Sequence, residues 1–597
     1  MVTRQRIALL LTGLVVLTGI AAVPASEVPS SPCAGATERC TASIRVPLNW
    51  ADPDSPRLSI PYVWLPHRDR EEASAGTILG LQGGPDQVAD PGSVKEFTTA
   101  LGSTLADHDL LIVERRGFGE STAWKCPELT VHDPATITAC ANQPQGRYDN
   151  TAQRVADIDA VRVVLGLDRL ILYGNSYGSV DGPAYAARYP RHTAAAILDS
   201  PNDPLDARTG FAQGMDFPHI QAAQLATVPV PCARSVTCRV LPGTARGRVE
   251  QLVTRLRAHP DPRVSLQGLN SVLAYRMPWT AQQLNGAAAA YLAGDKAPLR
   301  RLVSVAGPPP GQQDPDPMLR MHPPAYLAYF CNDSEFHFDR SAGAAQRRKQ
   351  LADYRRTHPE RPMTTAEAFG RYGAYEDWCA NWTTGVVDPP VPTAARYPDI
   401  PVLTIAGTLD AGAVSSARQL AARFGKRGQT LVVPFGTHAG SLTPSIYRPC
   451  VDAAIRSFIT APRRPVTDHC SGENFRALGR FPRGAMDWPA TAYYTAADAV
   501  APFNPNNAFG PSEVPGLRGG TITHRDNRVT LNEDRFLPGT AVSGTVELTG
   551  DGTAHARLRT AGHRIELSWR PWVARETVRL RGTADGRPFS SVLPRTS

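Results

Sequence analysis

The sequence lacks the motifs of the common metalloenzymes and nucleic-acid-binding proteins. It contains no Cys-x-x-Cys, no His-Glu-x-x-His and no tight cluster of cysteine and histidine, which excludes the usual zinc sites. It also lacks a long basic run, because 63 basic and 55 acidic residues are interleaved to give a net charge of +8. We therefore expect no metal, no other cofactor and no nucleic-acid partner.

Long apolar segments and internal repeats are also missing. After the first 25 residues no segment is apolar enough to span a bilayer, so stable membrane insertion is not expected. The 597 residues, 42% of them hydrophobic and 20% charged, indicate a globular protein of about two to four domains.

The first 25 residues have the features of a secretory signal. Arg4 and Arg6 precede the apolar run 7–23, and Val23-Pro24-Ala25 offers small residues for cleavage after Ala25. An uncleaved anchor is the alternative, but the run is shorter than the about 20 residues that a spanning helix needs. We predict a secreted, extracellular protein, with the cell envelope as a second location.

The ten cysteines are an even number, which in an exported protein predicts disulfides. We expect each cysteine to pair with its nearest neighbour along the chain, although other pairings satisfy the same count. The predicted pairs are Cys33 with Cys40, Cys126 with Cys140, Cys232 with Cys238, Cys331 with Cys379, and Cys450 with Cys470.

Short apolar runs alternate with longer amphipathic stretches from Thr77 onward, the pattern of parallel strands and crossover helices. The strands are expected at 77–81, 110–113, 170–173, 194–198, 402–406 and 431–435. The predicted fold class is therefore α/β, with a mostly parallel sheet covered by helices on both faces.

Two regions depart from this alternation. Residues 203–399 contain helical stretches such as 281–292 and 344–356 between proline-rich loops, which predicts a helical cap. After about Pro505, strands that alternate apolar and polar residues predict a small antiparallel β domain, at 545–548, 554–559, 565–569 and 578–581. The expected organisation is a signal peptide at 1–25, core at 26–202, cap at 203–399, core with a C-terminal module at 400–494, and β domain at 505–597.

The strongest local motif is Gly174-Asn175-Ser176-Tyr177-Gly178, which follows the apolar strand expected at 170–173 and precedes a helix-compatible segment. A serine on such a tight strand-to-helix turn projects its hydroxyl above the sheet near a helix N-terminus, and the turn needs small residues on both sides. The motif predicts a nucleophile elbow with Ser176 as nucleophile.

A serine hydroxyl needs a base and an orienting acid before it can attack. Asp410 follows the expected strand 402–406, and His438 follows the expected strand 431–435, so both lie where active-site loops of open α/β sheets occur. The order Ser176, Asp410, His438 is the order expected for this architecture.

The oxyanion of a tetrahedral intermediate needs two backbone N–H donors. We assign one to Tyr177 and the other to the loop Gln82-Gly83-Gly84-Pro85 after an early strand. Pro85 has no N–H, so Gly84 is the first choice and Gly83 the second.

Taken with the elbow, four further segments resemble the α/β-hydrolase fold, and within it the proline iminopeptidases and tripeptidyl aminopeptidases secreted by actinomycetes. The matching segments are Gly83-Gly84-Pro85, 114–121, 156–162 and 185–190. The spacing of Cys450 and Cys470 after His438 is similar to the C-terminal module of the tripeptidyl enzymes. The resemblance runs from about Cys33 to about Gly479, is weakest in the cap, and leaves the β domain outside.

The resemblance implies a serine exopeptidase of the tripeptidyl or prolyl type, which releases short peptides from free N-termini. Three positions depart from the family pattern: Asp86 replaces a common glycine, Glu114 replaces a common aspartate, and Asp410 is followed by Ala411-Gly412-Ala413. A carboxylesterase or other small acyl hydrolase on the same triad is the alternative, because serine acyl transfer also works on esters. A degenerate hydrolase that only binds is a third hypothesis.

An exopeptidase has to pair the substrate ammonium with a carboxylate, because a buried unpaired cation is costly. The cap concentrates acids beside the two cysteines 331 and 379. The candidates are Asp333, Glu335, Glu376 and Asp377, with Asp333 favoured. The β domain carries no predicted catalytic residue, and contact with the cell wall is one role open to it.

Overall fold

The computed structural model describes residues 31–122, 124–205, 217–274, 278–306, 323–370, 373–385, 388–440, 448–467, 470–472, 475–503, 512–571 and 577–594. The predicted signal peptide at 1–25 lies outside these residues. Among the described residues, no helix combines the length and the hydrophobicity needed to cross a bilayer.

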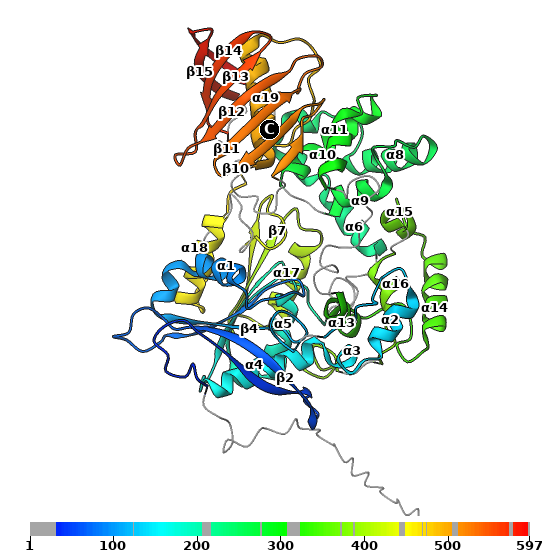
Figure 1. The fold of residues 1–597 in the computed structure, drawn as a ribbon, viewed down its shortest axis with the longest axis vertical. Coiled ribbons are helices and arrows are strands. Elements are labelled where there is room, and N and C mark those ends of the chain that lie inside the picture. The colour runs from blue at the N-terminus through cyan, green and yellow to red at the C-terminus, as the bar shows by residue number, and fades with distance from the viewer. Residues whose placement is uncertain are drawn as a thin grey trace, which may run out of the picture.

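An eight-stranded sheet forms the centre of the molecule, in the order β1-β2-β4-β3-β5-β6-β7-β8 (Figure 1). Strands β3 to β8 run parallel, whereas β1 and β2 are antiparallel additions at one edge. The strands are β1 (Cys40–Asn49), β2 (Asp52–Leu65), β3 (Gly76–Leu81), β4 (His108–Val113), β5 (Leu170–Asn175), β6 (Thr193–Asp199), β7 (Val402–Gly407) and β8 (Gly428–Val433). The predicted α/β-hydrolase architecture is confirmed.

Helices cover both faces of this sheet because successive side chains of each strand point to opposite faces. Ile78 packs with α1 (Pro91–Leu101) and α18 (Arg448–Thr460) on one face. Its neighbour Leu79 packs on the other face with three helices. These are α4 (Thr151–Val164), α5 (Gly178–Arg188) and α17 (Ala413–Arg423).

The β1–β2 hairpin is the part of the sheet that the sequence analysis did not predict. Prolines at 53, 56 and 61 interrupt β2, and proline inside a run argues against a strand. The hairpin nevertheless pairs over most of its length, from Cys40 opposite Trp64 to Asn49 opposite Asp52. Strand β4 pairs with β2 only from Tyr62 to Leu65, so the stretch of β2 that contains the prolines is paired with a strand on one side alone, β1. A proline there leaves no second ladder without its N–H donor.

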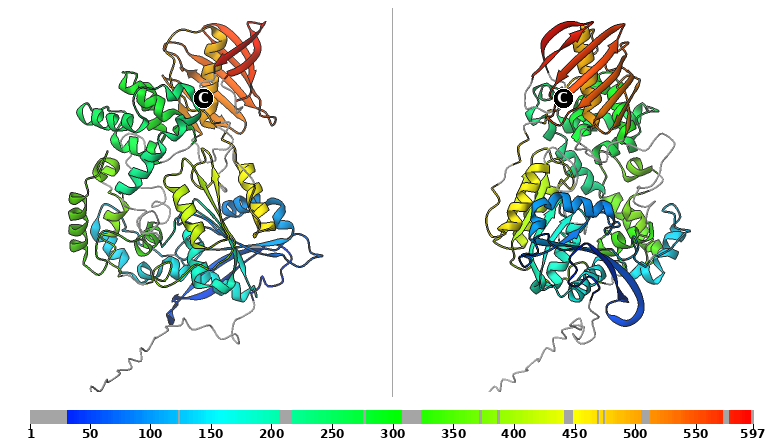
Figure 2. Two further views of the ribbon diagram at one scale, coloured as in Figure 1. Left: turned by 180° about the vertical axis from the view of Figure 1, so that it is seen from behind. Right: turned by 60° about the vertical axis from the view of Figure 1, so that its left-hand side comes forward.

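A second sheet of eight strands follows, antiparallel throughout, in the order β16 to β9 (Figures 1 and 2). Its strands are β9 (Glu513–Pro515), β10 (Thr521–Arg525), β11 (Arg528–Asp534), β12 (Val542–Leu548), β13 (Ala554–Thr560), β14 (His563–Trp569), β15 (Thr577–Ala584) and β16 (Arg587–Pro594). The four strands predicted here are β12 to β15. Helix α19 (Trp488–Val500) packs on the buried face, where the rings of Tyr493 and Trp569 lie 5.7 Å apart.

The helical insertion between β6 and β7 divides into two groups. The helices α8 (Ala245–Ala258), α9 (Leu266–Ala274), α10 (Pro278–Leu292) and α11 (Ala297–Ala306) share one hydrophobic core with α19 and the second sheet. The helices α13 (Pro323–Asp333), α14 (Ala344–Thr357) and α16 (Tyr375–Cys379) pack instead around Tyr177. The domain boundaries given above stay a prediction, but the second sheet does not stand apart from the insertion.

All five predicted cysteine pairs are bonded in the structure. The pair Cys331–Cys379 joins α13 to α16 across 48 residues of the insertion. The pair Cys450–Cys470 fastens the start of α18 to the segment that follows it. Disulfides of this kind stabilise a fold mainly by restricting the unfolded chain.

A buried ion pair joins the insertion to α19, the helix that packs on the second sheet. Arg301 in α11 donates to both carboxylate oxygens of Asp498 in α19, one of them at 2.8 Å, and both side chains are at most 3% exposed. We predict that Arg301→Leu lowers the free energy of unfolding by about 3–5 kcal/mol, because Asp498 would be left buried without its cation.

Urea unfolding followed by tryptophan fluorescence measures this loss. The control is Arg246→Leu, whose side chain is 63% exposed and pairs with Glu250 one helical turn away. It should cost no more than about 1 kcal/mol. Equal effects of the two substitutions would mean that the pair does not join the two parts.

Candidate active site

Ser176 stands on a sharp turn between β5 and α5, and its φ is 49°. Glycine is required at positions 174 and 178, because neighbouring backbone atoms lie where a side chain would begin. A Cβ atom at Gly174 would lie 2.3 Å from the carbonyl oxygen of Gly178, and one at Gly178 would lie 1.9 Å from that of Leu81. The predicted elbow geometry is therefore present, with a strained backbone at the serine.

The structure brings the three residues of the predicted triad together. His438 Nε2 lies 2.8 Å from Ser176 Oγ, and His438 Nδ1 lies 2.9 Å from Asp410 Oδ2. Asp410 follows β7 and His438 follows β8, so the ends of three parallel strands supply the three side chains. These distances suit proton transfer from the serine to the imidazole, with Asp410 fixing the ring.

Asp410 controls the charge of His438. The imidazole is 52% exposed. Its partial desolvation lowers the pKa, but the charge and hydrogen bond of Asp410, with the charge of Asp199, outweigh this and raise the pKa to about 9. A histidine with this pKa is mostly protonated at pH 7, so the neutral imidazole that can take a proton from Ser176 predominates only above about pH 9.

Tyr177, the first predicted oxyanion donor, follows Ser176 in the chain, and the loop that carries the second lies against Ser176. Tyr177 is the first residue before α5, so its N–H belongs to the helix N-terminus. In that loop, a Cβ atom at Gly83 would lie 2.8 Å from Ser176 Cβ. The N–H of Gly83 donates to the Gln82 side chain at 3.1 Å, which favours Gly84 as the second donor. Both assignments stay predictions.

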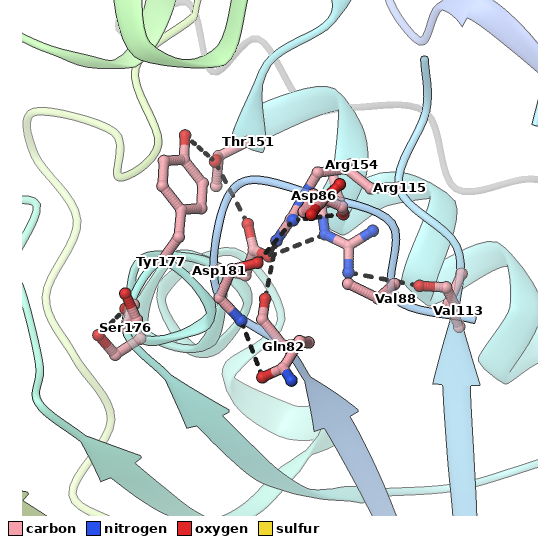
Figure 3. Close-up of polar contacts among 12 residues, drawn as sticks. Gln82, Asp86, Val88, Val113, Arg115, Thr151, Arg154, Ser176, Tyr177 and Asp181 are labelled. Carbon is pink, nitrogen blue, oxygen red and sulfur yellow. Dashed lines mark hydrogen bonds and ion pairs between the residues drawn. The ribbon is translucent and has the colours of Figure 1, made fainter. Parts of the chain in front are cut away.

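A buried ionic network holds the loop 82–86 in this place (Figure 3). Asp181 in α5 accepts from Arg115 at 2.7 Å and from Arg154 at 2.8 Å, and all three side chains are fully buried. Burial raises the pKa of Asp181, but the two arginines outweigh it and hold the pKa below its ordinary value. Asp181 is thus ionised inside the protein, and the positive charges of Arg115 and Arg154 compensate its negative charge.

Arg115 also holds the loop directly. Its guanidinium donates to the carbonyl oxygens of Gln82 at 3.2 Å, Gly83 at 3.4 Å and Asp86 at 3.0 Å. The sequence analysis noted Arg115 only within a family segment and missed Asp181 and Arg154. The available signals were Arg115 and Arg116, which follow the buried strand β4 after Glu114, and Asp181, the single acid of α5.

Glu114, which departs from the family pattern, supports the next part of the same loop. Its carboxylate accepts from the N–H groups of Val88 at 3.0 Å, Ala89 at 3.3 Å and Arg115 at 2.8 Å. Burial raises the pKa of Glu114, while these backbone donors lower it.

The four acids predicted to bind a substrate ammonium lie in different surroundings. Asp333 is buried and accepts from the hydroxyl of Tyr177 at 2.7 Å and the N–H of Thr151 at 3.0 Å. Burial raises its pKa to about 7 against these hydrogen bonds. Asp333 therefore reaches the elbow through the side chain of Tyr177.

The other three acids differ from Asp333 in their exposure and in their partners. Glu376 is buried and Asp377 partly exposed, and both pair with Arg355, at 3.4 Å and 2.6 Å. Glu335 is exposed. The disulfide Cys331–Cys379 brings their two segments together as predicted, but no observation assigns an ammonium-binding role to any of the four.

The pKa of His438 gives a prediction that does not depend on a substrate. We expect NMR titration of the ring to give a pKa of about 9, well above the ordinary 6.5. Asp410→Asn should lower this pKa, because it removes the charge that favours the imidazolium. An unchanged value would show that Asp410 does not govern His438.

The comparisons with known proteins agree with this geometry. Residues 76–229 match the family described as alpha/beta hydrolase fold, and residues 366–471 match that described as TAP-like protein. The tripeptidyl aminopeptidase of Streptomyces lividans is 22% identical over 465 residues, which are 71% of this chain and 82% of that protein.

Two further relatives match over shorter stretches. A probable proline iminopeptidase of Streptomyces coelicolor is 27% identical over 187 residues, 31% of this chain and 48% of that protein. The serine protease Hip1 of Mycobacterium tuberculosis is 34% identical over 121 residues, 19% of this chain and 22% of that protein. This chain thus spans about half or less of these two relatives. The chain has an α/β-hydrolase fold with a TAP-like domain and is distantly homologous to the tripeptidyl aminopeptidases and proline iminopeptidases of Streptomyces.

Proposed function

We propose that the protein is a secreted serine exopeptidase that releases short peptides, of the tripeptidyl or prolyl type, from free N-termini. The observation that carries the proposal is the chain of contacts from Ser176 through His438 to Asp410. The distant relatives described as peptidases support the choice of peptide substrates. The signal predicted at 1–25 and the five disulfides support export.

The reaction follows from the positions of these groups. Ser176 Oγ attacks the scissile carbonyl carbon while His438 Nε2 takes its proton, and the carbonyl oxygen becomes an oxyanion held by the N–H groups of Tyr177 and Gly84. His438 then protonates the leaving amine, and the C–N bond breaks to leave an acyl ester on Ser176. A water molecule, deprotonated by His438, attacks the ester carbon, and His438 returns the proton to Ser176 Oγ as the C–O bond breaks, which releases the acid product and regenerates the serine.

Recognition of the free N-terminus falls to the cap. We propose that one of the four predicted acids pairs with the ammonium group of the substrate. Asp333 lies nearest the elbow by contact, through Tyr177, whereas Arg355 already neutralises Glu376 and Asp377. Glu335 is exposed and could meet a substrate entering from solvent.

A carboxylesterase or other small acyl hydrolase is the alternative function. Three of the four candidate acids already have partners within the protein, and this favours an uncharged substrate. The same serine and oxyanion donors would act on an ester, so the choice depends on recognition and not on the triad.

We predict that Ser176→Ala and His438→Ala each lower kcat by about 10⁶-fold, because nucleophile and base act as one unit. Asp410→Asn should cost about 10⁴-fold. Steady-state hydrolysis of a peptide arylamide and of a short acyl ester measures these losses.

A fluorophosphonate probe gives a direct readout. It should label the parent protein at Ser176, and mass mapping should find no label on Ser176→Ala. Full activity of Ser176→Ala, purified free of host enzymes, would show that the assignment is wrong.

A substrate panel separates the peptidase from the esterase. For a peptidase, a tripeptidyl or prolyl arylamide with a free amine should be cleaved at least about 100-fold faster than its N-acetylated counterpart, since the buried carboxylate would lose its cation. Efficient cleavage of the N-acetylated peptide would contradict an exopeptidase, and ester turnover alone would favour the alternative.

Neutral amide variants then identify the acid. Of Asp333→Asn, Glu335→Gln, Glu376→Gln and Asp377→Asn, the variant at the ammonium site should lose activity on free-amine peptides and keep it on esters. Asp353→Asn, an exposed acid of α14 paired with Lys349, is the matched control. Equal losses on both substrates would point to damage of the cap.

A further inference from the structure

The two faces of the second sheet differ sharply in composition. Its inward positions are apolar and pack against α19 and the insertion helices. Its outward positions on β13, β14 and β15 alternate with these and are exposed. Five of the exposed outward side chains are arginines, namely Arg557, Arg559, Arg564, Arg579 and Arg581.

Two of these arginines lie directly opposite each other. In the register of β13 with β14, Arg559 is the partner of Arg564, and Arg557 lies two residues away on the same face. Like charges directly opposite in an antiparallel pair destabilise a sheet. A bound anion would offset the repulsion between Arg559 and Arg564.

The nearby carboxylates do not neutralise the pair. Glu566 lies opposite Arg557 and not opposite Arg559. Asp585, at the β15–β16 turn, holds the ring of His563 at 2.7 Å and the backbone N–H of Arg564 at 2.8 Å. Among the described residues, no ion pair involves the side chains of the five arginines.

On the same face, a second pair of opposed arginines has its positive charge compensated by a glutamate. Arg525 lies opposite Arg528 across β10 and β11, and there Glu547 of β12 pairs with Arg528 at 2.5 Å. No equivalent acid meets Arg559 and Arg564 within the described chain. The contrast makes the β13–β14 pair the focus of the positive charge.

The spacing of the arginines suits a linear polyanion. Residues two apart on a strand lie about 7 Å from each other, and adjacent strands lie about 4.8 Å apart, so Arg557, Arg559 and Arg564 are close neighbours. Arg581 lies opposite Ser568, about 13 Å farther along the strands from Arg564, so Arg579 and Arg581 extend the charge along the face. Arginine offers a planar fork that binds phosphate oxygens in pairs. Proteins that bind single-stranded nucleic acids usually combine positive charge with aromatic side chains on which the bases stack. The described outward positions of β10 to β16 carry no Phe, Tyr or Trp.

We propose that this exposed face, centred on Arg557, Arg559 and Arg564 and extended by Arg579 and Arg581, binds a linear phosphodiester polymer that carries no bases. Such a contact would hold the enzyme on a phosphate-rich surface while the site at Ser176 stays free. The proposal does not depend on the substrate of Ser176.

Binding of fluorescently labelled poly(glycerol phosphate) to the full-length protein, followed by anisotropy over a range of salt concentrations, tests the proposal. The triple variant R557Q/R559Q/R564Q should bind at least tenfold more weakly at low salt. The slope of log K against log salt should fall by about two to three, near one for each lost phosphate contact. The variant should keep the parent's activity on a small ester.

The matched control is R239Q/R246Q/R255Q, which removes the same number of charges from exposed positions of the insertion. It should change binding less than threefold. Equal weakening of polymer binding by both triple variants would show that only the net charge matters and would overturn the proposal. Unchanged binding by R557Q/R559Q/R564Q would also overturn it. Tighter binding of single-stranded DNA, or equal binding of polyglutamate, would overturn the choice of a base-free phosphate polymer.

Discussion

The pairing of Asp181 with two buried arginines is the interaction on which the arrangement around Ser176 depends. Removing one partner from such a group costs about 3–5 kcal/mol, because a charge is then left buried without compensation. The protein places this costly group in the helix that begins beside Ser176, and Arg115 reaches from it to three carbonyl groups of the loop 82–86. One charge cluster therefore fixes both sides of the space where an oxyanion would form.

Tyr177 extends this arrangement into the cap. Its backbone belongs to the elbow, its ring lies over the Arg115 guanidinium at 5.3 Å, and its hydroxyl donates to Asp333 of α13. The half of the insertion that contains α13 is thus seated directly on the elbow. The other half joins the second sheet through one hydrophobic core and the Arg301–Asp498 pair. The insertion is the physical link between the site and the C-terminal sheet.

The elements that could be predicted from sequence are those encoded locally. The glycines at 174 and 178 indicate a tight turn in which no larger residue fits. The pattern of short apolar strands places Asp410 and His438 just after β7 and β8. The ionic network could not be predicted in this way, because Arg115 and Asp181 are 66 residues apart and neither local segment identifies the other as its partner. The shared core of α8–α11 with the second sheet could not be predicted for the same reason. The amphipathic pattern of a helix shows that one face is buried, but not which element that face packs against.

The central claim, that Arg115 holds the loop 82–86 in position for catalysis at Ser176, is tested most directly by the rate of acylation. Arg116 is a neighbouring control, because it is equally buried and paired with Asp157 at 2.6 Å but reaches the carbonyl of Leu48 instead of the loop. Stopped-flow measurement of the burst with an activated ester should show Arg115→Lys acylating about 10- to 100-fold more slowly than the parent, with KM little changed. Arg116→Lys, compared at a temperature where both variants are folded, should acylate at the parent rate. Equal acylation rates in the two variants would contradict the account.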